Sequence, residues 1–124
     1  MDFELDAEQR LLQDSLAKMF AERYTFADRR AYATELPGWS RARWSDYADI
    51  GVLGLALEAG ASRDGNFVHL MSMMAAYGRA LALEPYLASV VLCGSLLRRV
   101  GNERQQQALL PAITAGKMLM ALAH

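Results

Sequence analysis

Apolar residues recur at helical spacing along almost the whole chain, and capping residues, prolines and glycines separate one such segment from the next. In the first segment, residues 6–23, Asp6 and Gln9 form a capping box ahead of an apolar stripe. The stripe consists of Leu12, Leu16, Met19, Phe20 and Tyr24. Because residues three or four positions apart share a helix face, each stripe needs a packing partner. The pattern predicts an all-α fold, an up-and-down helical bundle of about five to six helices.

Two shorter helices are expected next. One covers residues 26–32, and the Pro37-Gly38 pair then breaks the chain. Ser40 caps the other, which runs to about residue 50 and stops at Gly51. Its inward face carries Trp44, Tyr47 and Ile50. Residues 52–64 are rich in turn formers and are expected to form a loop.

Two long helices follow the loop. Asn66 is expected to cap the first, and its apolar face carries Phe67, Leu70, Met71, Met74, Gly78 and Leu81. Glu84-Pro85 begins the second, which reaches Val100, because proline suits a first helical turn. The apolar residues of this second helix surround most of its circumference, namely Tyr86, Leu87, Val90, Val91, Leu92, Leu96 and Leu97. That distribution predicts the most buried element, in the middle of the bundle.

The last helix begins at Asn102 with Gln105, contains Pro111 and ends at Gly116. Residues 118–124 then form a bare apolar run that reads as the start of a buried β-strand. A single strand has no ladder partner for its backbone groups. Either the run packs as a tail, or the sheet to which it belongs lies outside this sequence.

Composition narrows the function classes. Of the 124 residues, 53% are hydrophobic and 22% charged, which indicates a globular domain, and the net charge of −1 gives no long-range attraction for nucleic acid. The single cysteine, Cys93, is expected to be an inert buried thiol in a reduced, cytoplasmic setting. The longest apolar stretch, residues 86–97, is too short to span a bilayer. No metal-ligand or catalytic set is recognisable around His69 or elsewhere, so catalytic, cofactor and metal residues are expected to be absent.

Three stretches, taken together, resemble the start of an acyl-CoA dehydrogenase. Residues 1–12, MDFELDAEQRLL, resemble the family's opening "F.LT.EQ..L", and residues 44–55, WSDYADIGVLGL, are similar to "W..LAE.GLLGL". Residues 100–116, VGNERQQQALLPAITAG, are similar to "G..EQ...LP.LA.G". Residues 77–88, YGRALALEPYLA, look like the small subunit of pimeloyl-CoA dehydrogenase and related heteromeric enzymes.

The resemblance implies a domain order and a cofactor. Family members begin with a helical domain, continue into a β-domain and end in a four-helix bundle. Residues 1–117 would be the N-terminal-like helical domain, and residues 118–124 the start of the missing β-domain. The strand that contacts flavin, the catalytic carboxylate and the FAD-binding segments would follow. FAD is therefore expected in the complete enzyme and not in this chain alone.

The resemblance also implies where substrate binds. In the family the helix after "YG" lines the acyl tunnel, which places Glu84, Tyr86, Leu87, Ala88 and Val91 near the acyl tail. For Glu84 two interpretations are open. Its carboxylate lies in the apolar tunnel, where it needs a partner, or it faces solvent as an acid at a helix start. The family's "P.E.GG.G" loop is here residues 58–65, EAGASRDG, which lack the proline and have fewer glycines. This departure puts the loop's usual contacts in doubt.

Two hypotheses for function follow. In the first, the chain is the N-terminal domain of a flavin-dependent enzyme that oxidises an acyl-CoA thioester at Cα–Cβ. It would supply tunnel wall and packing surface, and it would form a homo- or hetero-oligomer with another acyl-CoA dehydrogenase subunit. In the second, it is a stand-alone helical binding or structural module without enzyme activity. Bound flavin distinguishes the two hypotheses, because only the complete enzyme of the first hypothesis holds it.

Overall fold

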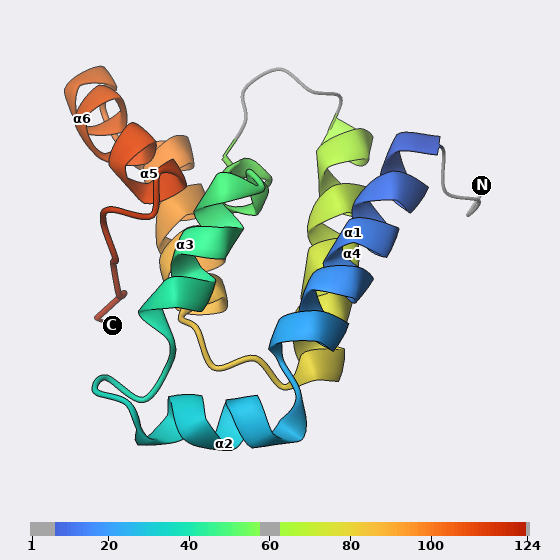
Figure 1. The fold of residues 1–124 in the computed structure, drawn as a ribbon. Helices are drawn as coiled ribbons and strands as arrows, with labels where there is room; N and C mark the ends of the chain where they lie inside the picture. The colour runs from blue at the N-terminus through green and yellow to red at the C-terminus, as the bar shows by residue number, and fades with distance from the viewer. Residues whose placement is uncertain (1–6, 58–62, 124) are drawn as a thin grey trace. The chain divides into compact units, whose positions relative to one another are not determined.

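The computed structural model describes residues 7–57 and 63–123, which form helices, turns and irregular segments (Figure 1). No strand occurs within these two ranges, so the all-α prediction is confirmed. The chain divides into two compact units. The first combines Met1–Trp39 with Ser62–Leu83, and the second combines Ser40–Ala61 with Glu84–His124.

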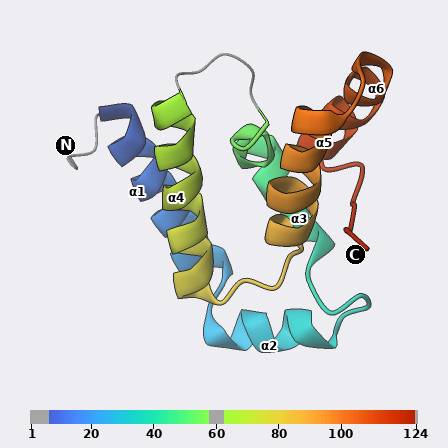
Figure 2. The same ribbon diagram turned by 180° about the vertical axis from the view of Figure 1, so that it is seen from behind.

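In the first unit, α1 (Ala7–Arg23) and α4 (Arg63–Ala80) lie side by side and run in the same direction (Figures 1 and 2). Their contact is apolar and closely packed. Leu16 and Met73 are each 0% exposed and Phe20 is 7% exposed. The α1 stripe predicted from the sequence is therefore the face that α1 buries. Asp6, its predicted cap, lies outside the described residues.

The third helix of the first unit is α2 (Phe26–Thr34), the short helix expected from the sequence. Thr25 and Asp28 form its capping box, which satisfies backbone N–H groups at the helix start. Two long-range hydrogen bonds join this part of the chain to the end of α4. Arg29 Nε donates to the Leu81 carbonyl at 2.8 Å, and the Leu83 N–H donates to the Tyr24 hydroxyl at 2.7 Å.

The face that α4 buries differs from the prediction. Phe67 and Met71 are 60% and 55% exposed, whereas Ser72 is 7% exposed and Met73 fully buried. The helix also begins at Arg63, so Asn66 lies within it and is not its N-cap. Apolar side chains lie on two neighbouring faces of α4. Hydrophobicity alone does not distinguish the face that contacts α1 from the face that stays exposed.

The second unit contains the remaining helices. These are α3 (Arg41–Asp49), the 3₁₀ turn η1 (Val52–Gly54), the π-helix η2 (Tyr86–Gly94), α5 (Ser95–Val100) and α6 (Glu103–Thr114). Ser40 caps α3 by accepting the Arg43 N–H, as predicted, and Trp44 and Tyr47 are buried. Ile50 is 48% exposed, so its inward placement was wrong. Gly51 has φ +80°, which explains why a glycine ends this helix.

The predicted helix from residue 84 to Val100 proves to be two elements. Its first part is π-helical, and α5 continues from it. The expectation that it is buried nearly all round was wrong. Val90 is 0% exposed, but Leu92 and Leu96 are 50% and 43% exposed and Val100 is 74% exposed. One side of η2 packs into the core of the second unit, whereas Leu87 and Leu92 on its other side are 48% and 50% exposed.

The C-terminal segment follows α6, whose Asn102–Gln105 capping box is confirmed. The predicted β-strand is not confirmed. Residues 118–123 have no regular secondary structure, because no neighbouring strand in the described parts offers them a ladder. The segment is attached as a tail. Trp44 Nε1 donates to the Gly116 carbonyl at 3.1 Å, and the Met120 N–H donates to Ser89 Oγ at 3.0 Å.

Candidate functional site

Glu84 is the residue about which the sequence left two interpretations, and its carboxylate is buried in the second unit. The residue is 1% exposed. Its Oε2 accepts the hydroxyl of Tyr47 at 3.0 Å, and its Oε1 accepts the backbone N–H of Ser40 at 3.3 Å. The interpretation in which Glu84 faces solvent is therefore wrong.

Hydrogen bonding and helix geometry explain how this carboxylate is accommodated. A buried carboxylate costs several kcal/mol unless donors compensate for its lost hydration. Tyr47 is itself 1% exposed and supplies one such donor. Ser40 supplies another from the N-terminal end of α3, where the helix dipole favours negative charge. Glu84, two positions before η2, thus contacts both the N-cap and the last turn of α3.

Tyr86 connects η2 to η1 through another buried hydrogen bond. Its side chain is 0% exposed, and its hydroxyl donates to the Val52 carbonyl at 2.8 Å. Burial raises the pKa of the Tyr86 phenol above its ordinary value of 10.0, because the phenolate would lose its hydration. Tyr86 therefore stays a neutral hydrogen-bond donor that fixes the beginning of η2 against η1.

The other three sequence-predicted substrate residues lie differently. Leu87 is 48% exposed, Ala88 is exposed and Val91 is half-buried. Glu84 and Tyr86 point into the core of the unit, while Leu87 and Ala88 open to its outside. The five residues share one short segment, but the structure does not bring them around one cavity.

Ser40 and Tyr47 are the polar partners that sequence reasoning did not connect with this site. The sequence predicts only local roles for them, Ser40 as a helix cap and Tyr47 as a core residue of the same helix. The available signal was Glu84 itself, since a carboxylate next to a long apolar run needs donors. The partners lie 44 and 37 residues away in the sequence, so spacing could not identify them.

Metal and membrane sites receive no support from the described ranges. No cluster of three or more His, Cys, Asp or Glu side chains that could hold a metal ion occurs in residues 7–57 and 63–123. Among the helices of those ranges, none has the length and apolarity required to span a bilayer. Cys93 is a buried free thiol, as expected.

Comparison with known families is decisive for the chain as a whole. The model of the family described as "Acyl-CoA dehydrogenase, N-terminal domain" matches residues 6–117. The chain belongs to this family. Acyl-CoA dehydrogenase FadE27 of Mycobacterium tuberculosis is 30% identical over 86 residues, which cover 68% of this chain and 23% of FadE27.

Two solved structures share the fold. The ChsE4-ChsE5 complex from Mycobacterium tuberculosis contains a chain that is 25% identical, with a TM-score of 0.83, covering 98% of this chain and 34% of that one. A variant of the Tcur3481-Tcur3483 steroid ACAD is 24% identical, with a TM-score of 0.79, and shows the fold alone, covering 92% of this chain and 31% of that one. The chain spans roughly a quarter to a third of the length of these relatives. None of the three is named as a pimeloyl-CoA dehydrogenase, so the resemblance of residues 77–88 to its small subunit stays a prediction.

Proposed function

We propose that this chain supplies a wall of the acyl-binding tunnel in an FAD-dependent acyl-CoA dehydrogenase. The complete enzyme would oxidise an acyl-CoA thioester at Cα–Cβ. The observation that carries the proposal is the division of η2 into two sides. Its inner side is fixed by the Glu84–Tyr47 and Tyr86–Val52 hydrogen bonds, and its outer side presents Leu87 and Ala88.

In this proposal the five predicted substrate residues act in two ways. Leu87, Ala88 and Val91 contact the apolar acyl tail, whose burial is favourable in proportion to the area removed from water. Glu84 and Tyr86 hold that wall from behind. A wall held by buried hydrogen bonds keeps its shape when no substrate is present, which reduces the ordering cost of binding.

The starts of α2, α3 and α6 do not suit FAD, and in this proposal the rest of the enzyme holds the cofactor. A flavin pyrophosphate needs free backbone N–H groups, as at an uncapped helix start. The starts of α2 and α6 are closed by their own capping boxes, and the start of α3 is occupied by Ser40 and Glu84. We assign no step of flavin chemistry to this chain and expect the isolated chain to bind no FAD.

The same proposal covers boundaries, partners and location. Residues 1–117 form the helical domain, and residues 118–124 lead into a β-domain. Two relatives are named as two-component assemblies, ChsE4-ChsE5 and Tcur3481-Tcur3483. Their names support a hetero-oligomer with a second acyl-CoA dehydrogenase subunit, as in the pimeloyl-CoA dehydrogenases that residues 77–88 resemble. The single cysteine agrees with a cytoplasmic location.

The test uses the protein isolated from its own host under native conditions, together with the proteins that co-purify. The proposal predicts stoichiometric bound flavin and acyl-CoA-dependent reduction of an electron acceptor. The alternative, a helical module without enzyme activity, predicts a colourless preparation with neither property. A flavin-free assembly that still binds acyl-CoA would also contradict the dehydrogenase proposal.

A further inference from the structure

A pocket of about 280 Å³ lies between α1 and α4 in the first unit. Its floor is formed by Phe20, Tyr24 and Ser72, each of which is 7% exposed. None of the five residues proposed for the acyl wall lines it. The two aromatic rings are held against each other edge to face, with centroids 5.9 Å apart, so the floor is preformed.

Alanines make the walls of this pocket. Positions 17 and 21 on α1 and positions 76 and 80 on α4 are all alanine, and each pair is separated by one helical turn. Larger side chains at these positions would interdigitate and fill the space between the helices. The four methyl groups leave a narrow apolar slot that is open to solvent.

Three polar side chains at the pocket have no partner in the described part of the chain. They belong to Gln13, Ser72 and Arg79, and no hydrogen bond or ion pair there engages them. Ser72 is 7% exposed and its hydroxyl oxygen still faces open space, while the Arg79 side chain is exposed. All three groups can donate, and Arg79 carries a permanent positive charge.

The spacing of these donors restricts which ligands could fit the pocket. Ser72 and Arg79 lie on the same face of α4, two helical turns apart, which is about 10 Å along the axis. The alanine walls and aromatic floor lie between them. A molecule that satisfies this arrangement has an anionic group at the Arg79 end and an apolar body of several carbons.

We propose that this pocket binds a small aliphatic carboxylate. Its carboxylate pairs with the Arg79 guanidinium, whose planar donor pair matches a carboxylate. Its hydrocarbon body lies over Phe20 and Tyr24 between the alanines, toward Ser72 and Gln13. The site is separate from the proposed acyl wall, so the inference stands or falls independently of the dehydrogenase proposal.

The experiment is a titration of the 124-residue chain with hexanoate, followed by amide chemical shifts in NMR spectra. We expect saturable binding with a Kd on the order of millimolar, in keeping with so small a ligand. The shifts should be largest at the lining positions of α1 and α4. Hexanol, which has the same chain without the charge, should bind about tenfold more weakly.

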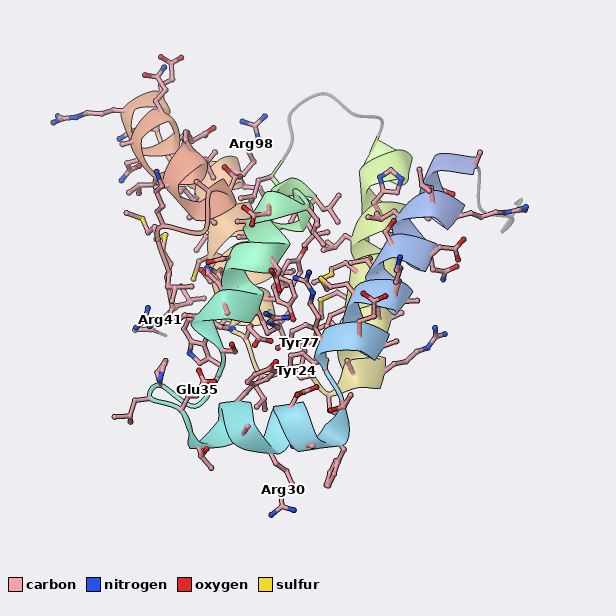
Figure 3. The ribbon with its side chains drawn as sticks, viewed as in Figure 1. Tyr24, Arg30, Glu35, Arg41, Tyr77 and Arg98 are labelled. Atoms are coloured by element: carbon pink, nitrogen blue, oxygen red, sulfur yellow. The ribbon has the colours of Figure 1, made fainter. Side chains whose placement is uncertain are left out.

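Variants locate the interaction. Arg79→Gln should weaken hexanoate binding about fivefold or more, because the charged partner is lost. Ala76→Leu should abolish binding by filling the slot, with the circular dichroism signal confirming that the helices remain. The matched control is Arg30→Gln, because Arg30 is exposed on α2 and points away from that helix (Figure 3). It should bind hexanoate like the parent.

Several results would overturn the proposal. These are no saturable binding, equal affinity for hexanol and hexanoate, or equal losses in Arg79→Gln and Arg30→Gln. Shifts at the pocket that depend on protein concentration and not on hexanoate would show that a second copy of the chain occupies the slot. That outcome would also contradict a carboxylate site.

Discussion

The hydroxyl of Tyr47 donates to Glu84 Oε2 at 3.0 Å, and both residues are 1% exposed. The bond joins the last turn of α3 to the residue two positions before η2. Hydrogen bonds to buried charged groups are among the stronger ones in proteins. The pair therefore contributes to stability, and it positions the segment that we propose as acyl wall.

Tyr47→Phe is expected to lower the free energy of unfolding by about 1–3 kcal/mol, because the buried carboxylate loses a donor. Urea unfolding of the 124-residue chain measures the change. Tyr32→Phe is the matched control, since its hydroxyl donates to the Arg23 carbonyl at an exposed position, and it should cost less than about 1 kcal/mol. In a double-mutant cycle, Tyr47→Phe and Glu84→Gln should be coupled by about 0.5–3 kcal/mol. Additive effects would show that the two groups do not interact in solution.

The burial of the Tyr86 phenol predicts that the protein loses stability at alkaline pH. Its folded-state pKa is raised above the ordinary value of 10.0, so the folded state keeps a proton that the unfolded state releases. The contribution to stability is therefore complete below pH 10 and declines above it, by about 1.4 kcal/mol per pH unit until the raised pKa is reached. Tyr86→Phe should be less stable at neutral pH, because it loses the bond to Val52, but should show a shallower alkaline decline. Parallel declines for the two proteins would contradict this assignment.

The two sides of η2 should respond differently to truncation. Val90 is 0% exposed, and Val90→Ala is expected to cost about 1–3 kcal/mol through lost burial and an added cavity. Leu92 is 50% exposed, and Leu92→Ala should cost less than about 1 kcal/mol. Thermal or urea unfolding distinguishes the two variants. Equal losses would mean that the outer side of η2 is covered in solution.

Local signals in the sequence predicted most of the helices, whereas contacts between distant residues escaped it. The capping box at Asn102 and Gln105 and the stop at Gly51 depend on neighbouring residues, so they could be recognised directly. The exposure of Leu92 could not, because an element that is apolar all round does not reveal which side finds a partner. The π-helical form of η2 also escaped prediction, since π and α turns have similar local preferences.

The candidate site, like the fold, could be predicted from the sequence only in part. The position of Glu84 was identified through family resemblance, but its environment depends on Ser40 and Tyr47, which are distant in the sequence. The pocket between α1 and α4 had no sequence signal. Alanines at one-turn spacing are ordinary helix formers, and only the pairing of the two helices turns them into walls.

The C-terminal tail should promote self-association. Leu119 and Leu122 are 41% and 55% exposed, and the backbone of this segment has no sheet partner in the described residues. Deletion of residues 118–124 should leave the far-UV circular dichroism signal intact, because the helices end earlier, at Thr114. It should also raise the monomer fraction in sizing chromatography. If the deletion unfolds the chain, then the core requires the tail, which contacts Ser89 through the Met120 N–H.

The central claim is that the outer side of η2 contacts the acyl chain, and its most direct test is the chain-length profile of the natively isolated enzyme. Ala88→Leu adds bulk at an exposed position of η2, and Ala108→Leu adds the same bulk at an exposed position of α6. Ala88→Leu should lower kcat/KM for long acyl-CoA substrates about tenfold more than for short ones, because overpacking the wall shortens the space for the tail. Ala108→Leu should leave the profile unchanged. An Ala88→Leu profile that matches the parent at every chain length would contradict the account.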